Sequence, residues 1–148
     1  MIKLSRLTDY GIVLMTHLAG HSDQKAHNAR DLAKETGLPL PTVSKLLKVL
    51  ARKGFLTSQR GVRGGYTLAQ KPEDLSVAQI IEAFEGPVTL TTCSSGVGCC
   101  AHEPICPSRS HLQMINQVVR DALEKIVLSK MVRPFFPQLI SLTTVSGK

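Results

Sequence analysis

The chain has 148 residues, 43% hydrophobic and 20% charged, a composition that excludes a disordered protein and fits one compact domain with a docking element. Its apolar runs are far shorter than the about 20 residues that cross a bilayer, and residues 1–6 lack the apolar core of a signal peptide, so we expect a cytoplasmic protein without a membrane partner. The formal charge of +7 lies in residues 1–70, with eleven Lys/Arg against four Asp/Glu, whereas residues 71–148 hold seven of each, which favours a polyanion-binding first half over an ordinary solvated basic face.

The first predicted element is a helix that begins near Thr8, whose hydroxyl can cap it, with Asp9 in the first turn. Apolar residues follow at helical spacing: Ile12, Met15, Leu18 and Ala19. After a polar turn at residues 20–25, Asn28 starts a short second helix that Gly37 ends.

A third helix is predicted from Pro41 to about Gly54, with an apolar stripe at Val43, Leu46, Leu47 and Leu50. A short helix, a turn and a longer helix form the plan of a helix-turn-helix. The face opposite the stripe carries polar residues: Thr42, Ser44, Lys45, Lys48 and Arg52. We expect the two small hydroxyl residues to reach base edges and the lysines to meet DNA phosphates, the alternative being a plain amphipathic helix with solvated cations.

Two short strands, Phe55–Ser58 and Tyr66–Ala69, are predicted next, joined by a glycine-rich turn that carries Arg60 and Arg63. A basic hairpin directly after a recognition helix is typical of a wing. Its arginines can contact the DNA backbone or enter a narrow minor groove, where the potential is strongly negative.

Ser76 and Gln79 form a capping box that opens a helix, and the Gly86–Pro87 pair stops it. We therefore divide the chain into a winged helix-turn-helix DNA-binding domain at 1–86, an irregular cysteine loop at 87–106, a dimerisation helix at 107–132 and a C-terminal tail at 133–148. The fold class is mainly α.

The long helix has a broad apolar stripe: Leu112, Ile115, Val118, Val119, Ala122, Leu123 and Ile126. A helix of this length in a chain with a small core is expected to pack against a second copy of itself. The alternative is packing on its own domain.

Four cysteines, Cys93, Cys99, Cys100 and Cys106, fall within 14 residues. A tight cluster in a chain without a secretion signal is typical of a metal or redox site. The paired C-x2-C knuckles of zinc sites are absent. Thiolates suit an iron–sulfur cluster because sulfur is a soft donor to iron; structural zinc, a thiol switch and inert thiols stay open.

Three segments stand before the cysteines and the long helix: residues 4–11 (Leu-Ser-x-x-Thr-Asp-Tyr-Gly), 40–47 (Leu-Pro-Thr-Val-Ser-Lys-Leu-Leu) and 60–68 (Arg-Gly-x-x-Gly-Gly-Tyr-x-Leu). In this combination the chain resembles the IscR/NsrR family of winged-helix iron–sulfur transcription regulators over residues 2–130. Within that family it is most similar to the branch that regulates SUF-system genes for iron–sulfur assembly.

The resemblance implies a homodimer crossed through the long helix at residues 107–132, bound to a double-stranded DNA operator. The family uses three cysteine ligands per [2Fe-2S] or [4Fe-4S] cluster and tends to keep five residues between the second and the third. The ligands implied for this chain are Cys93, Cys100 and Cys106, with Cys99 as a spare or alternate.

The resemblance leaves the fourth ligand open. IscR-like members use a histidine three residues after the last cysteine, where this chain has Arg109, and NsrR-like members use an aspartate of the partner's first helix, which Asp9 matches. Asp9 is therefore the candidate fourth ligand; the alternative is a helix-terminal acid favoured by the macrodipole. Three residues are held in reserve: His102, Glu103 and His111.

The function expected is that of a dimeric repressor that senses iron–sulfur status and controls iron–sulfur assembly genes. Because IscR-like proteins carry a glutamate where Ser44 stands, its operator should differ from theirs. A nitric-oxide-sensing repressor of the same fold is the near alternative, and a zinc-stabilised DNA-binding protein or a thiol redox switch is more distant. We expect no enzyme, because no cysteine has an evident positioned base.

Overall fold

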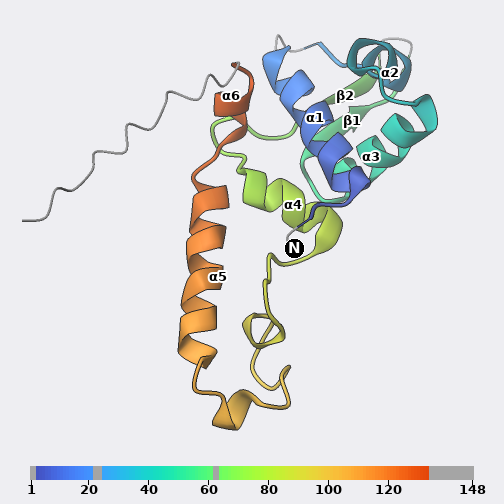
Figure 1. The fold of residues 1–148 in the computed structure, drawn as a ribbon. Coiled ribbons are helices and arrows are strands. Elements are labelled where there is room, and N and C mark those ends of the chain that lie inside the picture. Colours follow the sequence, from blue (N-terminus) through green and yellow to red (C-terminus); the bar gives the residue numbers. More distant parts are fainter. Residues whose placement is uncertain (1–2, 22–24, 62–63, 134–148) are drawn as a thin grey trace, which may run out of the picture.

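The structure is a computed structural model that describes residues 3–21, 25–61 and 64–133. It contains six α-helices and one two-stranded sheet, in the order α1 (Arg6–Gly20), α2 (Ala29–Thr36), α3 (Leu40–Arg52), β1 (Leu56–Gln59), β2 (Gly65–Leu68), α4 (Val77–Glu85), α5 (Arg109–Glu124) and α6 (Leu128–Met131). The first three helices and the hairpin form a compact head, from which α5 extends as an arm (Figure 1). The expected mainly helical, winged-helix fold is confirmed. Within the described ranges, no helix is both long and apolar enough to cross a membrane.

Helix α1 begins two residues before the predicted cap. Ser5, and not Thr8, is the N-cap: its hydroxyl accepts a hydrogen bond of 3.2 Å from the Thr8 backbone N–H. Thr8 is fully buried, and its hydroxyl donates to the Glu85 carboxylate at 2.6 Å. The same carboxylate accepts the Ser5 backbone N–H at 2.8 Å. Glu85, the last residue of α4, therefore ties the end of α4 to the start of α1.

This carboxylate predicts an acid-sensitive contribution to stability. The hydrogen bonds from Thr8 and Ser5 hold the pKa of Glu85 below its ordinary value. A lowered folded-state pKa stabilises the fold above the ordinary carboxylate pKa, and this stabilisation is lost as the pH falls through the folded-state pKa. We expect Glu85→Gln to lower the melting temperature by a few degrees at most at neutral pH, since the group is exposed.

The difference between wild type and Glu85→Gln should shrink as the pH falls through the lowered folded-state pKa of Glu85, because the wild-type carboxylate then becomes protonated as well. Melting curves followed by circular dichroism over that range measure it. Glu73→Gln, at an exposed acid, is the control. If the difference in melting temperature between wild type and Glu85→Gln stays constant with pH, the charged hydrogen bonds of Glu85 do not contribute to stability.

Helices α2 and α3 form the predicted helix-turn-helix. Asn28 caps α2 by accepting the Asp31 backbone N–H at 2.9 Å, and Gly37 follows α2 with a φ of 71°, a left-handed conformation that favours glycine. Pro39 precedes α3, and the predicted stripe of α3 is entirely buried: Val43, Leu46, Leu47 and Leu50.

The wing is an antiparallel hairpin in which Leu56 pairs with Leu68 and Gln59 with Gly65. The strands lie one residue nearer the turn than predicted. At their outer end, the Phe55 backbone N–H donates to the Leu50 carbonyl of α3 at 2.9 Å, and only the Phe55 carbonyl pairs across the hairpin, where it accepts the Ala69 N–H at 2.9 Å. His27 bridges to Tyr66 on the other edge of β2.

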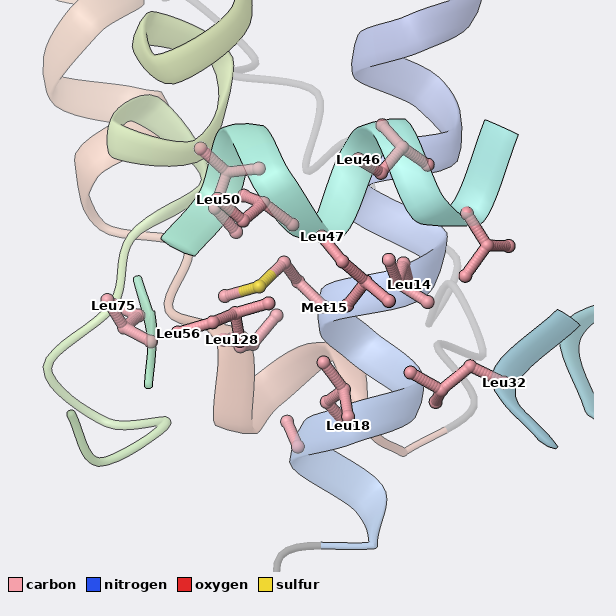
Figure 2. Close-up of a cluster of buried hydrophobic side chains, with 13 residues drawn as sticks. Leu14, Met15, Leu18, Leu32, Leu46, Leu47, Leu50, Leu56, Leu75 and Leu128 are labelled. Carbon is pink, nitrogen blue, oxygen red and sulfur yellow. The ribbon is translucent and has the colours of Figure 1, made fainter. Parts of the chain in front are cut away.

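The core lies where α1, α3 and the hairpin meet (Figure 2). Met15 of α1 faces Leu47 and Leu50 of α3, and leucines from distant segments close the cluster (Figure 2). One of them is Leu128 of α6, which is fully buried. Burying such a side chain contributes about 1.5–3 kcal/mol, so α6 is held to the head by its own core residue.

The helix predicted at 107–132 is continuous only to Glu124 and is wrong after that residue. Helix α5 spans Arg109–Glu124, and the chain then extends through Val127, which bridges to Ser76, before α6 begins. Backbone hydrogen bonds of 2.8 Å join Val77 to Ile126 and Leu128 to Leu75. A continuous helix would carry Leu128 away from the core, so the break lets the chain return. Of the predicted tail at 133–148, all but Arg133 lies outside the described residues.

The broad apolar stripe of α5 is divided between two faces. One side turns toward α4 and the loop, where Asn116 is buried and Leu112, Val119 and Leu123 are half-buried. The opposite side is exposed: Val118 at 62%, Met114 at 59% and Ile115 at 49%. The exposed residues Met114, Ile115 and Val118, with Ala122, are called here the outer α5 face.

Candidate metal centre and nucleic-acid interface

The cysteine loop at residues 87–106 connects α4 to α5. It lies beside the N-terminal part of α5, on the side of the molecule away from the hairpin (Figure 1). Asn116 of α5 anchors its first part: the side-chain amide oxygen accepts the Leu90 backbone N–H at 2.8 Å, and the amide nitrogen donates to the Val88 carbonyl at 3.3 Å. Sequence reasoning missed this residue, because an asparagine inside an apolar stripe is a polar interruption whose partner lies 26 residues away.

The four cysteines are free thiols in three different environments. Cys93 is buried in a single 3-10 turn, Thr92–Ser94, and its Sγ lies 3.2 Å from the Thr91 hydroxyl. Cys99 is exposed, and Cys100 and Cys106 are half-buried.

The donor set fits an iron–sulfur cluster chemically, since four soft sulfur atoms lie on one short span of chain. In the conformation described, no three His, Cys, Asp or Glu side chains within residues 3–21, 25–61 and 64–133 are placed to hold one metal ion. The predicted ligands Cys93, Cys100 and Cys106 therefore share a loop without converging, and the loop would have to rearrange to collect them.

The candidates for a fourth ligand are now placed. Asp9 is exposed in the first turn of α1, on the head. His102 and His111 are exposed on the loop and on α5. Arg109 is the first residue of α5 and forms an ion pair with Glu103. An arginine side chain offers only hydrogen-bond donors and cannot ligate a metal. The Glu103 carboxylate is already occupied by this ion pair, so neither residue is free to act as a ligand.

Glu103 has a structural role that the sequence did not reveal. Its side chain is only 7% exposed, and its second carboxylate oxygen accepts the Gly98 backbone N–H at 2.6 Å. The sequence feature that could have indicated this role is the isolation of its charge, because Glu103 is the sole Asp, Glu, Lys or Arg between residues 86 and 108.

The predicted DNA-contact residues of α3 lie on one outward face. Lys45 and Lys48 are exposed, and Thr42 and Ser44 are half-buried near the start of the helix. Among the described residues, neither lysine has a carboxylate within ion-pair distance. A helix with small polar residues first and free cations beyond them suits insertion into a DNA major groove.

The wing adds Arg60, which is exposed just after β1 and likewise has no ion-pair partner in the part of the chain that is described. Arg63, predicted for the same role, lies outside the described residues.

A histidine group on the head was not predicted. The rings of His17 and His21 stack with centroids 4.3 Å apart, and His27 meets His21 edge-on at 6.4 Å. His17 Nε2 lies 2.8 Å from a Glu35 carboxylate oxygen, and this hydrogen bond holds the pKa of Glu35 below its ordinary value. The group joins α1 to α2, and the i, i+4 spacing of the first two histidines was the available signal.

Comparison with known proteins gives a consistent result. Residues 4–134 match the family model described as "Rrf2: Iron-dependent Transcriptional regulator". Protein rrf2 of Nitratidesulfovibrio vulgaris is 30% identical over 109 residues, which cover 74% of this chain and 73% of that protein. The transcriptional regulator NsrR of Bacillus licheniformis is 25% identical over 132 residues, which cover 88% of this chain and 92% of that one.

Solved structures agree with the fold. The structure titled T. potens IscR is 27% identical and has a TM-score of 0.68, covering 88% of this chain and 86% of that one. CymR of B. subtilis, titled a global cysteine regulator, has a TM-score of 0.71 at 23% identity, covering 89% of this chain and 97% of that one, and supports the fold alone.

Proposed function

The chain belongs to the Rrf2 family of transcriptional regulators, which are DNA-binding proteins and not enzymes, and on this basis we propose that it is a dimeric repressor that senses iron–sulfur status. The genes under its control are those for iron–sulfur cluster assembly. The observation that carries the proposal is the position of four free thiols on the loop that joins α4 to α5.

The cluster is held by Cys93, Cys100 and Cys106, with Cys99 as the alternate and Asp9 of the second copy as the fourth ligand. A bound cluster supplies iron and sulfide that oxidants and nitric oxide attack, so its presence reports the state of the cell. The buried Cys93 anchors the set, and the exposed position of Asp9 leaves it accessible to a partner's loop.

A contact at the start of the loop and one just before it can transmit the shape of the loop to the rest of the molecule. Asn116 holds the start of the loop to α5, and Glu85 holds the end of α4 to α1. A change in the loop then alters how the two heads of a dimer are spaced on the operator. A coupling of about 1–3 kcal/mol between cluster and operator is the usual size of such an effect.

The wing gives a test of the DNA interface. Arg60→Ala should weaken operator binding and reduce the slope of log affinity against log salt by about two for a dimer, because each arginine releases about one counterion from the DNA. Fluorescence anisotropy at several salt concentrations measures both. Lys125→Ala, an exposed cation just past α5, should change neither. Unaltered affinity at every salt concentration in Arg60→Ala would remove this residue from the interface.

Metal analysis tests the proposed cofactor directly. Protein purified without air should be brown, contain iron and sulfide in matched amounts, and bind operator DNA differently before and after the cluster is removed. Colourless protein that contains zinc would overturn the proposal in favour of a zinc-stabilised DNA-binding protein.

Two specific observations support alternatives. The match of Asp9 to the aspartate ligand of NsrR-like members favours a nitric-oxide-sensing repressor, for which nitric oxide, rather than iron starvation, should release the operator. The free and exposed thiol of Cys99 favours a thiol redox switch, for which iron-free protein should lose operator affinity on oxidation and regain it with a reductant.

A further inference from the structure

Glu103 is a buried carboxylate in an otherwise uncharged loop. Its side chain is 7% exposed, and its two oxygens have different partners: Arg109 pairs with one and the Gly98 N–H donates to the other at 2.6 Å. An unpaired buried charge is costly, so the loop conformation around it depends on both partners.

Along the chain, these contacts link residues before, between and after the last three cysteines. Gly98 directly precedes the Cys99–Cys100 pair, Glu103 lies midway between Cys100 and Cys106, and Arg109 stands three residues after Cys106. One carboxylate therefore joins the chain before the second cysteine to the start of α5. Gly98 has a φ of 79°, so the backbone that presents its N–H favours glycine.

One N–H donor of Arg109 is buried and has no acceptor among the described residues. Its Nη2 pairs with Glu103, whereas its Nε is buried and has no hydrogen-bond partner among the described residues. A buried N–H without an acceptor is unusual in a native protein and calls for an explanation. Sulfur of a thiolate or of a cluster accepts such hydrogen bonds, and they raise the reduction potential.

We propose that Glu103 and Arg109 act together as a positioning pair: Glu103 holds the loop and orients Arg109, whose free Nε–H donates to the sulfur atoms that the loop collects. The second part rests on the proposed function, because it needs a bound cluster. The first part concerns the iron-free chain and is tested without one.

The iron-free protein tests the loop. Alkylation by iodoacetamide, resolved for each cysteine by mass spectrometry, should be about tenfold faster at Cys100 and Cys106 in Glu103→Gln than in wild type, because a charged hydrogen bond that restrains loop opening is lost. The buried Cys93 should keep its rate. Glu124→Gln, which breaks the exposed contact with Arg120, is the matched control.

Arg109→Gln should give the same acceleration, and the double variant should be no faster than either single one, because both changes remove one interaction. Arg109→Lys keeps the positive charge and should restore part of the protection. Rates in Glu103→Gln equal to those in the control would overturn the positioning role, as would equal acceleration of all four cysteines, which indicates general loosening of the fold.

The loaded protein tests the donor. Arg109→Lys lacks an Nε–H donor at that place, so its cluster should bleach several-fold faster in air and show a lower reduction potential than wild type. An unchanged potential and lifetime would overturn the donor role. A wild type that never takes up iron and sulfide refutes the proposed function instead, and the alkylation rates still decide the role of Glu103.

Discussion

Replacing Val118 with glutamate is expected to convert the proposed dimer into a monomer and to lower operator affinity by about 10²–10⁴-fold, since two linked heads bind two half-sites far more tightly than one head binds one. Val118 is 62% exposed at the centre of the outer α5 face, and its apolar neighbours Met114 and Ile115 are exposed as well. A glutamate there would be desolvated without a partner in the dimer.

Sedimentation velocity measures the dimer, and anisotropy measures operator affinity. The free monomer should keep its fold, because a glutamate on an exposed helix surface costs little. Lys125→Glu, which changes the charge at an exposed position just past α5, should remain dimeric. A Val118→Glu protein that stays dimeric would place the interface on another surface.

The head was predictable because its signals are local. Asn28 and Gly37 mark the two ends of α2, and the buried stripe of α3 follows the 3.6-residue period. The start of α1 was misplaced because two neighbouring hydroxyls could cap it. Which one does so depends on Glu85, 77 residues after Thr8, which takes the Thr8 hydroxyl for another bond.

The arm was predicted only in part, because its burial depends on tertiary partners. A seven-residue apolar stripe indicates a helix with much apolar surface but does not show that Val119 turns inward and Val118 outward. Nor does periodicity reveal the break after Glu124, since Ile126 continues the stripe. The break is imposed by the distant core that Leu128 fills.

The candidate site also has one part that the local sequence predicts and one part that depends on contacts seen only in the structure. The sequence predicts sulfur chemistry from the cysteine cluster, because residue type and spacing suffice for that inference, and this stays a prediction. The sequence does not reveal that Glu103 pairs with Arg109. The two residues are six positions apart, and the chain between them is irregular, so no helical or strand periodicity predicts their contact.

The largest expected effect belongs to the cysteines. Cys93→Ala, Cys100→Ala and Cys106→Ala should each abolish or severely lower the occupancy of the proposed cluster, because each change removes one of its three thiolate ligands. Cys99→Ala is the matched control: it removes an exposed thiol next to Cys100 and should leave most of the iron and sulfide bound. Loss of the cluster in Cys99→Ala with retention in Cys100→Ala would exchange the roles of these two neighbours.

Asp9→Ala completes the test of the ligand set. A carboxylate is a harder and more easily replaced ligand to iron than a thiolate, so the cluster should form in this variant but disappear faster in air. Because Asp9 lies on α1 of the DNA-binding head, its bond to a partner's cluster would also carry the signal, and operator affinity should cease to depend on the cluster. Normal air stability with full cluster-dependent binding would make Asp9 only a helix-terminal acid, whereas a labile cluster in His102→Ala or His111→Ala would move the fourth ligand to the loop or to α5.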